Sequence, residues 1–497
     1  MKLNYLKMLD KIGNDMGIVP VHISRKSIVE DAISTGSLTC DLIIGGGWPA
    51  GRWVALFGPE QSAKSTLLYH TLSNVIRQGI NSEYYDFEGS VDPKYLSSIL
   101  QVPNLNKVFG VRKEIGTWQI APQCRYFQAD TGEPYFRYIH RILQALPDKV
   151  QHNNSWFYVY DKKPTEKYSD KLYKNTKRYW VEAEDSGSQI IWFIDSLAAM
   201  LPEARDEKDE SKELALLARM FSQYIPLVKS RLARKRCSVV AVNQIRMKPM
   251  AFGNPEVESG GNAPKHYSDI RLSCRSISNP FGKGQIVEEP CWDGVGIDKY
   301  RYIKIMTTKN KCFSPYRTSL MRIWVESKGD SGKGLDPFFD VYQYLTETGQ
   351  IHPGESKKKK ELVITLPGIW TSQPWKWASL KELVLNPNKA EVYKKYKLND
   401  PKIGQIEDTE NKDIQKKLAK LLDIQAACKQ QIKTDKAFDL YFKTISGSGT
   451  KEAEPEKVCG SCVKFHKDKN CMEVEVGNEA CDDWKSEEEV EEESFDE

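Results

Sequence analysis

Short apolar runs alternate with helix-like stretches between Ile33 and about Val325, and this pattern organises most of the chain. In the helix-like stretches, apolar residues recur every three or four positions. Runs of this kind predict a mostly parallel sheet covered by helices, because such sheets are buried on both faces. Seven runs are predicted as strands: 53–57, 83–87, 189–194, 238–242, 269–274, 302–306 and 319–325. We therefore expect an α/β core with a mostly parallel sheet flanked by helices.

The segments outside this pattern predict further parts of the chain. Residues 1–32 carry a short amphipathic helical pattern and are predicted to be an N-terminal oligomerisation segment. The core is predicted at 33–335, and a small, mainly helical C-terminal domain at 336–450, with a lysine linker at 357–360 and helices at 377–384 and 411–442. Residues 451–485 are predicted as a cysteine-rich module and 486–497 as an acidic tail.

A glycine-containing turn follows the first predicted strand and precedes a helix. It consists of Gly58, Pro59, Glu60, Gln61, Ser62, Ala63, Lys64, Ser65 and Thr66. Backbone amides in such a turn can surround a phosphate chain, with Lys64 reaching the β- and γ-phosphates and the Ser65 hydroxyl holding Mg²⁺. Ala63 stands where glycine is usual, and a positive φ there would cost about 1 kcal/mol. The alternative is an ordinary turn that caps a helix.

Two acidic residues follow predicted strands at the edge where a nucleotide would lie. Asp195 ends the run at 189–194, and Glu88 follows the run at 83–87. Ligands of open α/β sheets bind at the carboxyl ends of the strands, so both carboxylates are expected beside the phosphate turn. Asp195 would hold Mg²⁺ through water, and Glu88 would orient and deprotonate the water that attacks the γ-phosphate. Alone, either acid would more often be a strand-end cap.

The composition and charge of the chain indicate its cellular compartment and the kind of partner it binds. None of its 497 residues belongs to an apolar run of 18 or to a secretory signal pattern, so a soluble, cytoplasmic protein with no membrane partner is expected. The odd number of cysteines, eleven, suits a reducing compartment. The net charge is +4, but residues 486–497 contain eight acids and no base, which leaves +12 on the rest. This asymmetry indicates a polyanionic partner, or a tail that only aids solubility.

Several motifs, in order, resemble those of the bacterial RecA recombinase family over roughly residues 30–325. They are Ile33-Ser34-Thr35-Gly36-Ser37-Leu38, the phosphate turn, Asp92-Pro93-x-Tyr95, Asp130-Thr131-Gly132-Glu133, Asp195-Ser196-Leu197-Ala198-Ala199, Ala218-Arg219-Met220-x-Ser222-Gln223, Asn243-Gln244-Ile245-Arg246-Met247-Lys248, Phe252-Gly253-Asn254-Pro255-Glu256 and Gly260-Gly261-Asn262-Ala263. The resemblance implies a DNA-dependent ATPase that uses ATP and Mg²⁺. Such a protein forms helical filaments on single-stranded DNA, pairs it with homologous double-stranded DNA and exchanges strands.

The resemblance also implies roles for residues at the matching positions. Glu88 matches the catalytic glutamate, Asp92 and Tyr95 the adenine-side motif, and Gln244 the glutamine that senses the γ-phosphate. The second DNA-binding loop corresponds to residues 245–262, and its matching positions are Arg246, Lys248, Phe252, Gly260, Gly261 and Asn262. Lys309 and Lys311 match paired lysines that reach a neighbouring subunit's γ-phosphate.

The chain departs from the family at several places. Insertions are predicted at 104–124 and 147–188, and the region of the first DNA-binding loop, near 203–213, is unusually acidic. The second insertion interleaves bases with aromatics, which suits stacking on single-stranded DNA or a surface excursion with its own small core. The insertions also suggest a phage or otherwise divergent genome.

A four-cysteine set lies outside every RecA motif. Cys459, Cys462, Cys471 and Cys481 could bind Zn²⁺, with His466 as a substitute ligand, or remain free thiols.

Two other functions stay open. A nucleotide-binding RecA-like scaffold without strand exchange would fit Ala63, the acidic first-loop region and the added modules. A hexameric RecA-core helicase would share the phosphate turn and acids, but Lys309, Lys311 and the Gly-Gly-Asn-Ala motif argue against it.

Overall fold

The computed structural model describes the core of the chain and parts of its C-terminal region. The described residues are 32–114, 117–153, 155–184, 187–204, 210–247, 256–291, 293–327, 330–347, 351–353, 361–366, 370–371, 375–386, 391, 395, 458–459 and 484–485. The chain divides into two compact units, Met1–Phe438 and Asp439–Glu497. The predicted N-terminal segment therefore lies outside the described residues, except for Ala32.

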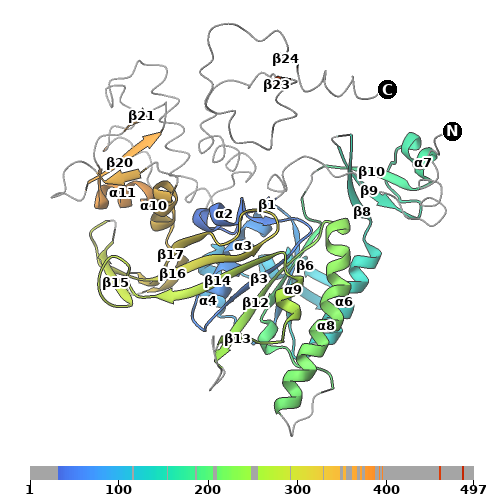
Figure 1. Ribbon diagram of the computed structural model, residues 1–497, viewed down its shortest axis with the longest axis horizontal. Coiled ribbons are helices and arrows are strands. Elements are labelled where there is room, and N and C mark those ends of the chain that lie inside the picture. Colours follow the sequence, from blue (N-terminus) through green and yellow to red (C-terminus); the bar gives the residue numbers. More distant parts are fainter. Residues whose placement is uncertain are drawn as a thin grey trace. The chain divides into compact units, whose positions relative to one another are not determined.

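An eleven-stranded sheet forms the centre of the first unit (Figure 1). Nine strands follow the order β18-β17-β16-β14-β3-β12-β11-β4-β7, while β13 pairs with β12 and β15 with β16. The half from β14 to β7 is parallel, and β14 to β18 pair antiparallel. The strands are β3 (Trp53–Gly58), β4 (Asn81–Asp86), β7 (Cys124–Gln128), β11 (Ile190–Asp195), β12 (Ser238–Met247), β13 (Glu256–Glu258), β14 (Ile270–Ile277), β15 (Ile286–Pro290), β16 (Ile297–Asn310), β17 (Thr318–Ser327) and β18 (Asp330–Leu335).

Helices cover both faces of the parallel half, because its strands are apolar on both sides (Figure 1). Val54 and Leu56 of β3 belong to a core with residues of α2, α3 and α4, whereas Trp53 belongs to a second core with residues of α6 and α8. The helices of this unit's core are α2 (Leu38–Ile44), α3 (Lys64–Arg77), α4 (Pro93–Leu100), α5 (Asn106–Phe109), α6 (Gly132–Ala145), α8 (Glu210–Lys235) and α9 (Ala263–Tyr267), with a 3₁₀ turn at Leu197–Ala199. The expected mostly parallel α/β core is confirmed.

All seven predicted strands lie in this sheet, but the sequence pattern missed β7, β13, β15 and β18. The missed strands lack the apolar run that marks a strand buried on both faces. In β7 only Cys124 is buried, and β18 has the polar, glycine-containing sequence DSGKGL. These strands lie at the two ends of the sheet or pair at its margin, where burial does not impose a continuous apolar run.

Three small sheets are formed by strands that precede β11 in the chain. A hairpin is formed by β5 (Val111–Glu114) and β6 (Thr117–Ile120). A separate three-stranded antiparallel sheet is formed by β8 (Asp148–His152), β9 (Ser155–Tyr160) and β10 (Tyr179–Ala183), with α7 (Asp170–Thr176) between the last two. A further two-residue pair joins β1 (Ala32–Ile33) to β2 (Trp48–Pro49).

The described part of 336–450 differs from the mainly helical domain that the sequence predicted. It contains α10 (Pro337–Glu347) and α11 (Trp377–Leu385), close to the helix predicted at 377–384. It also contains the strands β19 (Ile351–Pro353), β20 (Glu361–Leu366), β21 (Trp370–Thr371) and β22 (Trp375–Lys376), in which β20 pairs with the other three. The helix predicted at 411–442 and the lysine linker lie outside the described residues.

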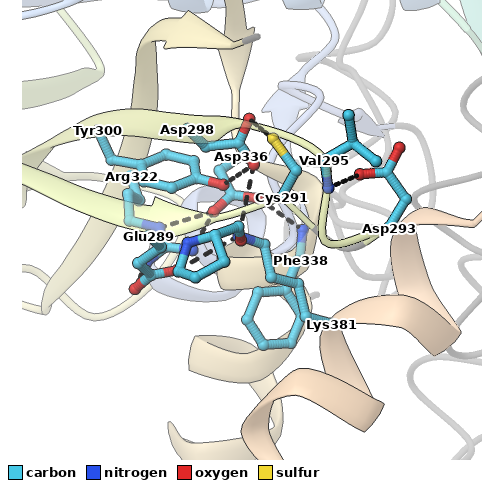
Figure 2. Close-up of polar contacts among 11 residues, drawn as sticks. Glu289, Cys291, Asp293, Val295, Asp298, Tyr300, Arg322, Asp336, Phe338 and Lys381 are labelled. Carbon is cyan, nitrogen blue, oxygen red and sulfur yellow. Dashed lines mark hydrogen bonds and ion pairs between the residues drawn. The ribbon is translucent and has the colours of Figure 1, made fainter.

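A buried ionic network joins α11 to the antiparallel half of the sheet (Figure 2). Arg322 of β17 is fully buried, and it donates through Nε to Asp336 Oδ2 at 2.6 Å and through Nη1 to Glu289 Oε1 at 2.7 Å. Lys381 of α11 donates to the Pro290 carbonyl at 2.8 Å and lies 3.4 Å from Asp298 Oδ2. Breaking such a buried pair is costly because one charge is left without a partner.

In the second unit, the described residues are two short strands, β23 (Val458–Cys459) and β24 (Trp484–Lys485), which pair antiparallel. Cys462, Cys471 and Cys481 lie outside the described residues, so the zinc hypothesis stays a prediction. Within the part of the chain that the structure describes, no group of three potential metal ligands occurs, and no helix is long and apolar enough to cross a membrane.

Candidate functional site

The phosphate turn connects β3 to α3 in a strained conformation. Ala63 immediately precedes α3 with φ +66° and ψ +22°, the left-handed region that the sequence analysis considered. This conformation costs about 1 kcal/mol for a residue with a Cβ. Gly58 has no room for a side chain, because a Cβ there would collide with the carbonyl oxygen of Cys274. The close approach of β14 therefore requires glycine where β3 leads into the turn.

The Lys64 ammonium lies within the phosphate turn. Its Nζ donates to the Pro59 carbonyl at 2.5 Å and lies 3.3 Å from the Ser62 hydroxyl, which itself donates to Pro59 at 2.8 Å. Burial lowers the pKa of Lys64, while nearby groups that include Asp195 and Glu88 oppose this effect. The turn thus holds a buried cation whose present partners are weak neutral acceptors, which suits an anion such as a phosphate.

Asp195 ends β11, where it pairs in register with Asp86 of β4. The Tyr84 hydroxyl donates to its Oδ2 at 2.8 Å, whereas its Oδ1 is buried and has no hydrogen-bond partner among the described residues. Burial raises the pKa of Asp195 to about 6, and the hydrogen bond from Tyr84 opposes this rise. An unsatisfied buried carboxylate oxygen near the Ser65 hydroxyl fits a Mg²⁺ site completed by water.

Three side chains from neighbouring strands converge next to this carboxylate. Glu88 Oε1 accepts hydrogen bonds from the Ser196 hydroxyl at 2.5 Å and from Gln244 Nε2 at 3.0 Å. Asp86 fixes the turn that carries Glu88, because its Oδ1 accepts from the amides of Glu88 at 3.1 Å and Gly89 at 2.8 Å. Glu88 itself is exposed, so its free carboxylate edge is accessible to water. The arrangement holds a potential general base in a defined position.

The adenine-side residues lie at the start of α4. Tyr95 is half-buried, and its hydroxyl lies 3.0 Å from the Thr66 hydroxyl of the phosphate turn. The Asp92 carboxylate instead caps α4, because it accepts from the amides of Lys94 at 2.8 Å and Tyr95 at 3.3 Å. Asp92 therefore orients the segment that bears Tyr95.

The segment predicted as the second DNA-binding loop begins on the strand that carries Gln244. Beyond Gln244, β12 continues as a hairpin with β13, in which exposed Arg246 pairs with Val257. Lys248 and Phe252 lie outside the described residues. The Asn243 amide donates to the Ser259 carbonyl at 3.1 Å, and the Ser259 amide donates to the Gln244 carbonyl at 3.2 Å.

After the hairpin, a buried glycine is followed by two exposed residues. Gly260 has φ +82°, and a Cβ there would collide with the Phe221 ring of α8. Gly261, with φ +73°, and Asn262 are exposed at the start of α9. Glycine at position 260 is thus required both by its positive φ and by its packing against Phe221. Residues 205–209 of the acidic first-loop region lie outside the described residues.

Lys309 and Lys311 are placed at the end of β16, next to α9. Lys309 Nζ donates to the carbonyls of Lys265 at 3.1 Å and His266 at 2.7 Å. Lys311 Nζ lies 3.8 Å from Asp269 Oδ1, and its side chain is 53% exposed. Neither contact is with the phosphate turn of the same chain.

The structure brings Ser65, Glu88, Asp195 and Gln244 to one edge of the sheet, but it also adds residues to which the sequence analysis gave no role. Ser196 follows Asp195 in a quoted motif, and its position after the strand-end acid was the only available signal. Tyr84 and Asp86 were not found, because their contacts with Asp195 and Glu88 depend on side-chain direction and on the pairing of β4 with β11.

The core of the chain is similar in sequence to known proteins. A family model for the RecA N-terminal domain matches residues 4–108 and 181–329, about half of the chain. RecA from Nostoc punctiforme is 28% identical over 325 residues, which cover 65% of this chain and 68% of that protein. RecA from Parasynechococcus marenigrum is 29% identical over 325 residues, with coverage of 65% and 66%. A crystal structure of the RadB recombinase has 14% identity and a TM-score of 0.35, and covers 61% of this chain and 98% of that one.

Proposed function

This chain belongs to the RecA family, and on that premise we propose that it is an ATP-dependent DNA recombinase. It would assemble as a helical filament on single-stranded DNA, pair it with homologous duplex DNA and exchange strands in recombination and repair. The observation that carries this proposal is the hydrogen bond between Gln244 and Glu88. It links the candidate hydrolytic base to the strand that continues into the predicted DNA-binding hairpin.

The phosphate turn and its neighbours supply the groups that ATP hydrolysis needs. Amides of the turn and Lys64 would bind the phosphates, and Tyr95 would lie against the adenine. Ser65 and Asp195 would hold Mg²⁺, which neutralises charge on the β- and γ-phosphates. Glu88 would accept a proton from the attacking water through the carboxylate edge that Ser196 and Gln244 leave open.

Gln244 provides a physical means of coupling nucleotide state to DNA affinity. Its amide now donates to Glu88, and a γ-phosphate oxygen would compete for the same donor. Because β12 runs directly from Gln244 into the β12–β13 hairpin, a change at this side chain would shift Arg246 and the loop that follows. Loss of the γ-phosphate would restore the bond to Glu88 and weaken DNA binding.

Lys309 and Lys311 would complete the site of the neighbouring subunit in a filament. Their contacts with α9 and Asp269 hold them at a surface away from the phosphate turn of their own chain. Two cations supplied across an interface would stabilise charge that develops on the transferred phosphoryl group. Hydrolysis would then depend on assembly, and assembly on DNA.

The test is ATP hydrolysis by the full chain with and without single-stranded DNA, followed by strand exchange between circular single-stranded and linear duplex DNA. DNA should stimulate hydrolysis, and Glu88→Gln should lower the turnover number by about 10²- to 10⁴-fold, which is the usual contribution of a positioned base. Glu114→Gln, an exposed glutamate in β5, is the matched control and should retain activity.

Other outcomes would refute the proposal. Nucleotide binding without hydrolysis or strand exchange in the wild type would favour the scaffold alternative. Ring-shaped particles with directional unwinding would favour a helicase.

A further inference from the structure

The β8–β10 module, defined as residues 148–183 with β8, β9, α7 and β10, lies mostly outside the RecA match. The family model leaves residues 109–180 unmatched, and the module's sheet is separate from the central sheet (Figure 1). None of the residues assigned above to nucleotide or DNA binding belongs to it. The kind of ligand that the module binds therefore has to be inferred from its own surface residues.

Positive charge is concentrated on one stretch of this module. Residues 161–178 contain seven bases and three acids, so 18 residues carry a net charge of +4, equal to that of the whole chain. Six of the bases are exposed lysines, and within the described structure none of them forms a salt bridge: Lys162, Lys163, Lys167, Lys171, Lys174 and Lys177. An unneutralised surface of this density attracts a polyanion.

The aromatic residues of the module are half-buried and pack against one another, which occupies ring faces and edges on which bases would otherwise stack. Tyr173 stacks on Tyr179 with centroids 4.6 Å apart, and Tyr168 meets Tyr179 edge-on at 4.9 Å. On another part of the sheet, Trp180 packs against Phe157 at 5.8 Å. None of the module's eight Phe, Trp and Tyr side chains is exposed. Recognition would therefore use phosphates rather than base faces.

The module is attached firmly to the carboxyl end of α8. Buried Asp148 of β8 lies 3.1 Å from Arg234 and 2.9 Å from Lys235, both in the last turn of α8. The Arg178 guanidinium also lies 3.3 Å from this carboxylate, and Arg236 covers the Trp156 ring at 4.4 Å. The module's sheet is thus held against the end of α8, and α7 of the same module carries Lys171 and Lys174.

This attachment separates the module from the predicted first DNA-binding loop. The predicted first-loop region, residues 203–213, ends in the first turn of α8, whereas the module is bound at the helix's other end. A helix of 26 residues is about 39 Å long at 1.5 Å per residue. The lysine surface would therefore contact a different stretch of nucleic acid from the one held by the predicted first loop.

We propose that the β8–β10 module is a second DNA-binding site, which binds the phosphate backbone of duplex DNA. The choice of DNA as the polyanion rests on the proposed recombinase function. Duplex DNA is favoured over a single strand because the lysines are exposed whereas the rings are half-buried in contacts with one another, and because a duplex carries twice the phosphate density of one strand. The site would hold duplex DNA beside a filament while the loops hold the single strand.

The test is binding of the full chain, without nucleotide, to a fluorescent 40-base-pair duplex across a range of salt concentrations. The triple variant Lys167→Gln, Lys171→Gln, Lys174→Gln should lose duplex affinity by on the order of tenfold or more, and the slope of log K against log salt should become shallower by up to about 2.7, or 0.9 for each lysine. The matched control neutralises three exposed lysines elsewhere, Lys94, Lys107 and Lys113, and should bind as the wild type does. The triple Lys→Arg variant of the module should retain affinity, because it retains the charge.

Equal affinities for the module variant and the control variant would overturn the proposal. A loss as large for single-stranded as for duplex DNA would overturn the assignment to duplex DNA. Because this assay needs no ATP, its result is independent of the hydrolysis test: a wild type that fails to hydrolyse ATP can still show module-dependent duplex binding, and the reverse can also occur.

Discussion

His70 makes the stability of the core depend on pH in a way that can be calculated. The residue lies in α3, the helix that follows the phosphate turn, and its Nε2 accepts a hydrogen bond from the Leu335 amide of β18 at 2.9 Å. Burial, with a smaller contribution from Arg77, lowers the pKa of His70 from 6.5 to about 3. The neutral ring is thus required both by burial and by its role as an acceptor.

The direction of this pH dependence follows from the number of protons that His70 binds in the folded and unfolded states. Between pH 6.5 and 3 the unfolded chain binds a proton at His70 and the folded chain does not. The contribution of neutral His70 to the free energy of unfolding is therefore fully present above pH 6.5 and is lost as the pH falls toward 3. From pH 6.5 to pH 5 the loss is 1.5 pH units at 1.36 kcal/mol each, or up to about 2 kcal/mol.

The perturbation that isolates this effect is His70→Gln, which can keep an acceptor for the Leu335 amide but cannot titrate. The free energy of unfolding would be measured by urea titration of both proteins at pH 7 and pH 5, followed by tryptophan fluorescence. The advantage of the wild type over the variant should shrink by about 2 kcal/mol at pH 5. Other titrating groups are common to both proteins and cancel in the difference. An advantage that is the same at both pH values would refute the reasoning.

Three further perturbations test the geometry of the core. Arg322→Met should lower the free energy of unfolding by about 3–5 kcal/mol in urea titrations, because it leaves buried carboxylates unpaired. Lys299→Met, which removes one partner of an exposed ion pair, should lower it by less than about 1 kcal/mol. Similar losses for the two variants would contradict the buried network. Ala63→Gly relieves about 1 kcal/mol of backbone strain but removes a buried methyl group that contributes about 0.8 kcal/mol. The free energy of unfolding should therefore change by less than about 1 kcal/mol, and a change above about 2 kcal/mol would show that the two effects do not cancel. Gly58→Ala should abolish nucleotide binding by displacing the phosphate turn, measured by calorimetric titration. Gly79→Ala, which has a positive φ but open space around its Cβ, should bind nucleotide normally.

The sequence predicted those parts of the fold in which burial on both faces dictates composition. Residues 53–57 of β3 and 190–194 of β11 are all apolar. Asp195 at the end of β11 and Glu88 after β4 meet at one edge because the two strands are parallel and in register. By contrast, β20 lies in a region predicted to be mainly helical, where no neighbouring pattern indicated its pairing with β19 and β22.

Side-chain contacts within the site were predicted less completely than the position of the site. Lys64, Glu88 and Asp195 were identified because their residue types and places after strands are typical of phosphate chemistry. The bond from Ser196 to Glu88 depends on the shape of the turn after β11, and the bond from Tyr84 to Asp195 crosses between strands. No pattern in one sequence encodes such contacts.

The position of β3 in the middle of the sheet has a consequence for how the protein is made. Val54 pairs with Val240 on one side and with Ile270 on the other, so both neighbours of this strand are translated about 190 to 220 residues later. At 5–20 residues per second, the ribosome needs about 10 to 40 s to supply them. During that interval the apolar strand that leads into the phosphate turn lacks both of its sheet neighbours, and its unpaired edges favour aggregation of the nascent chain.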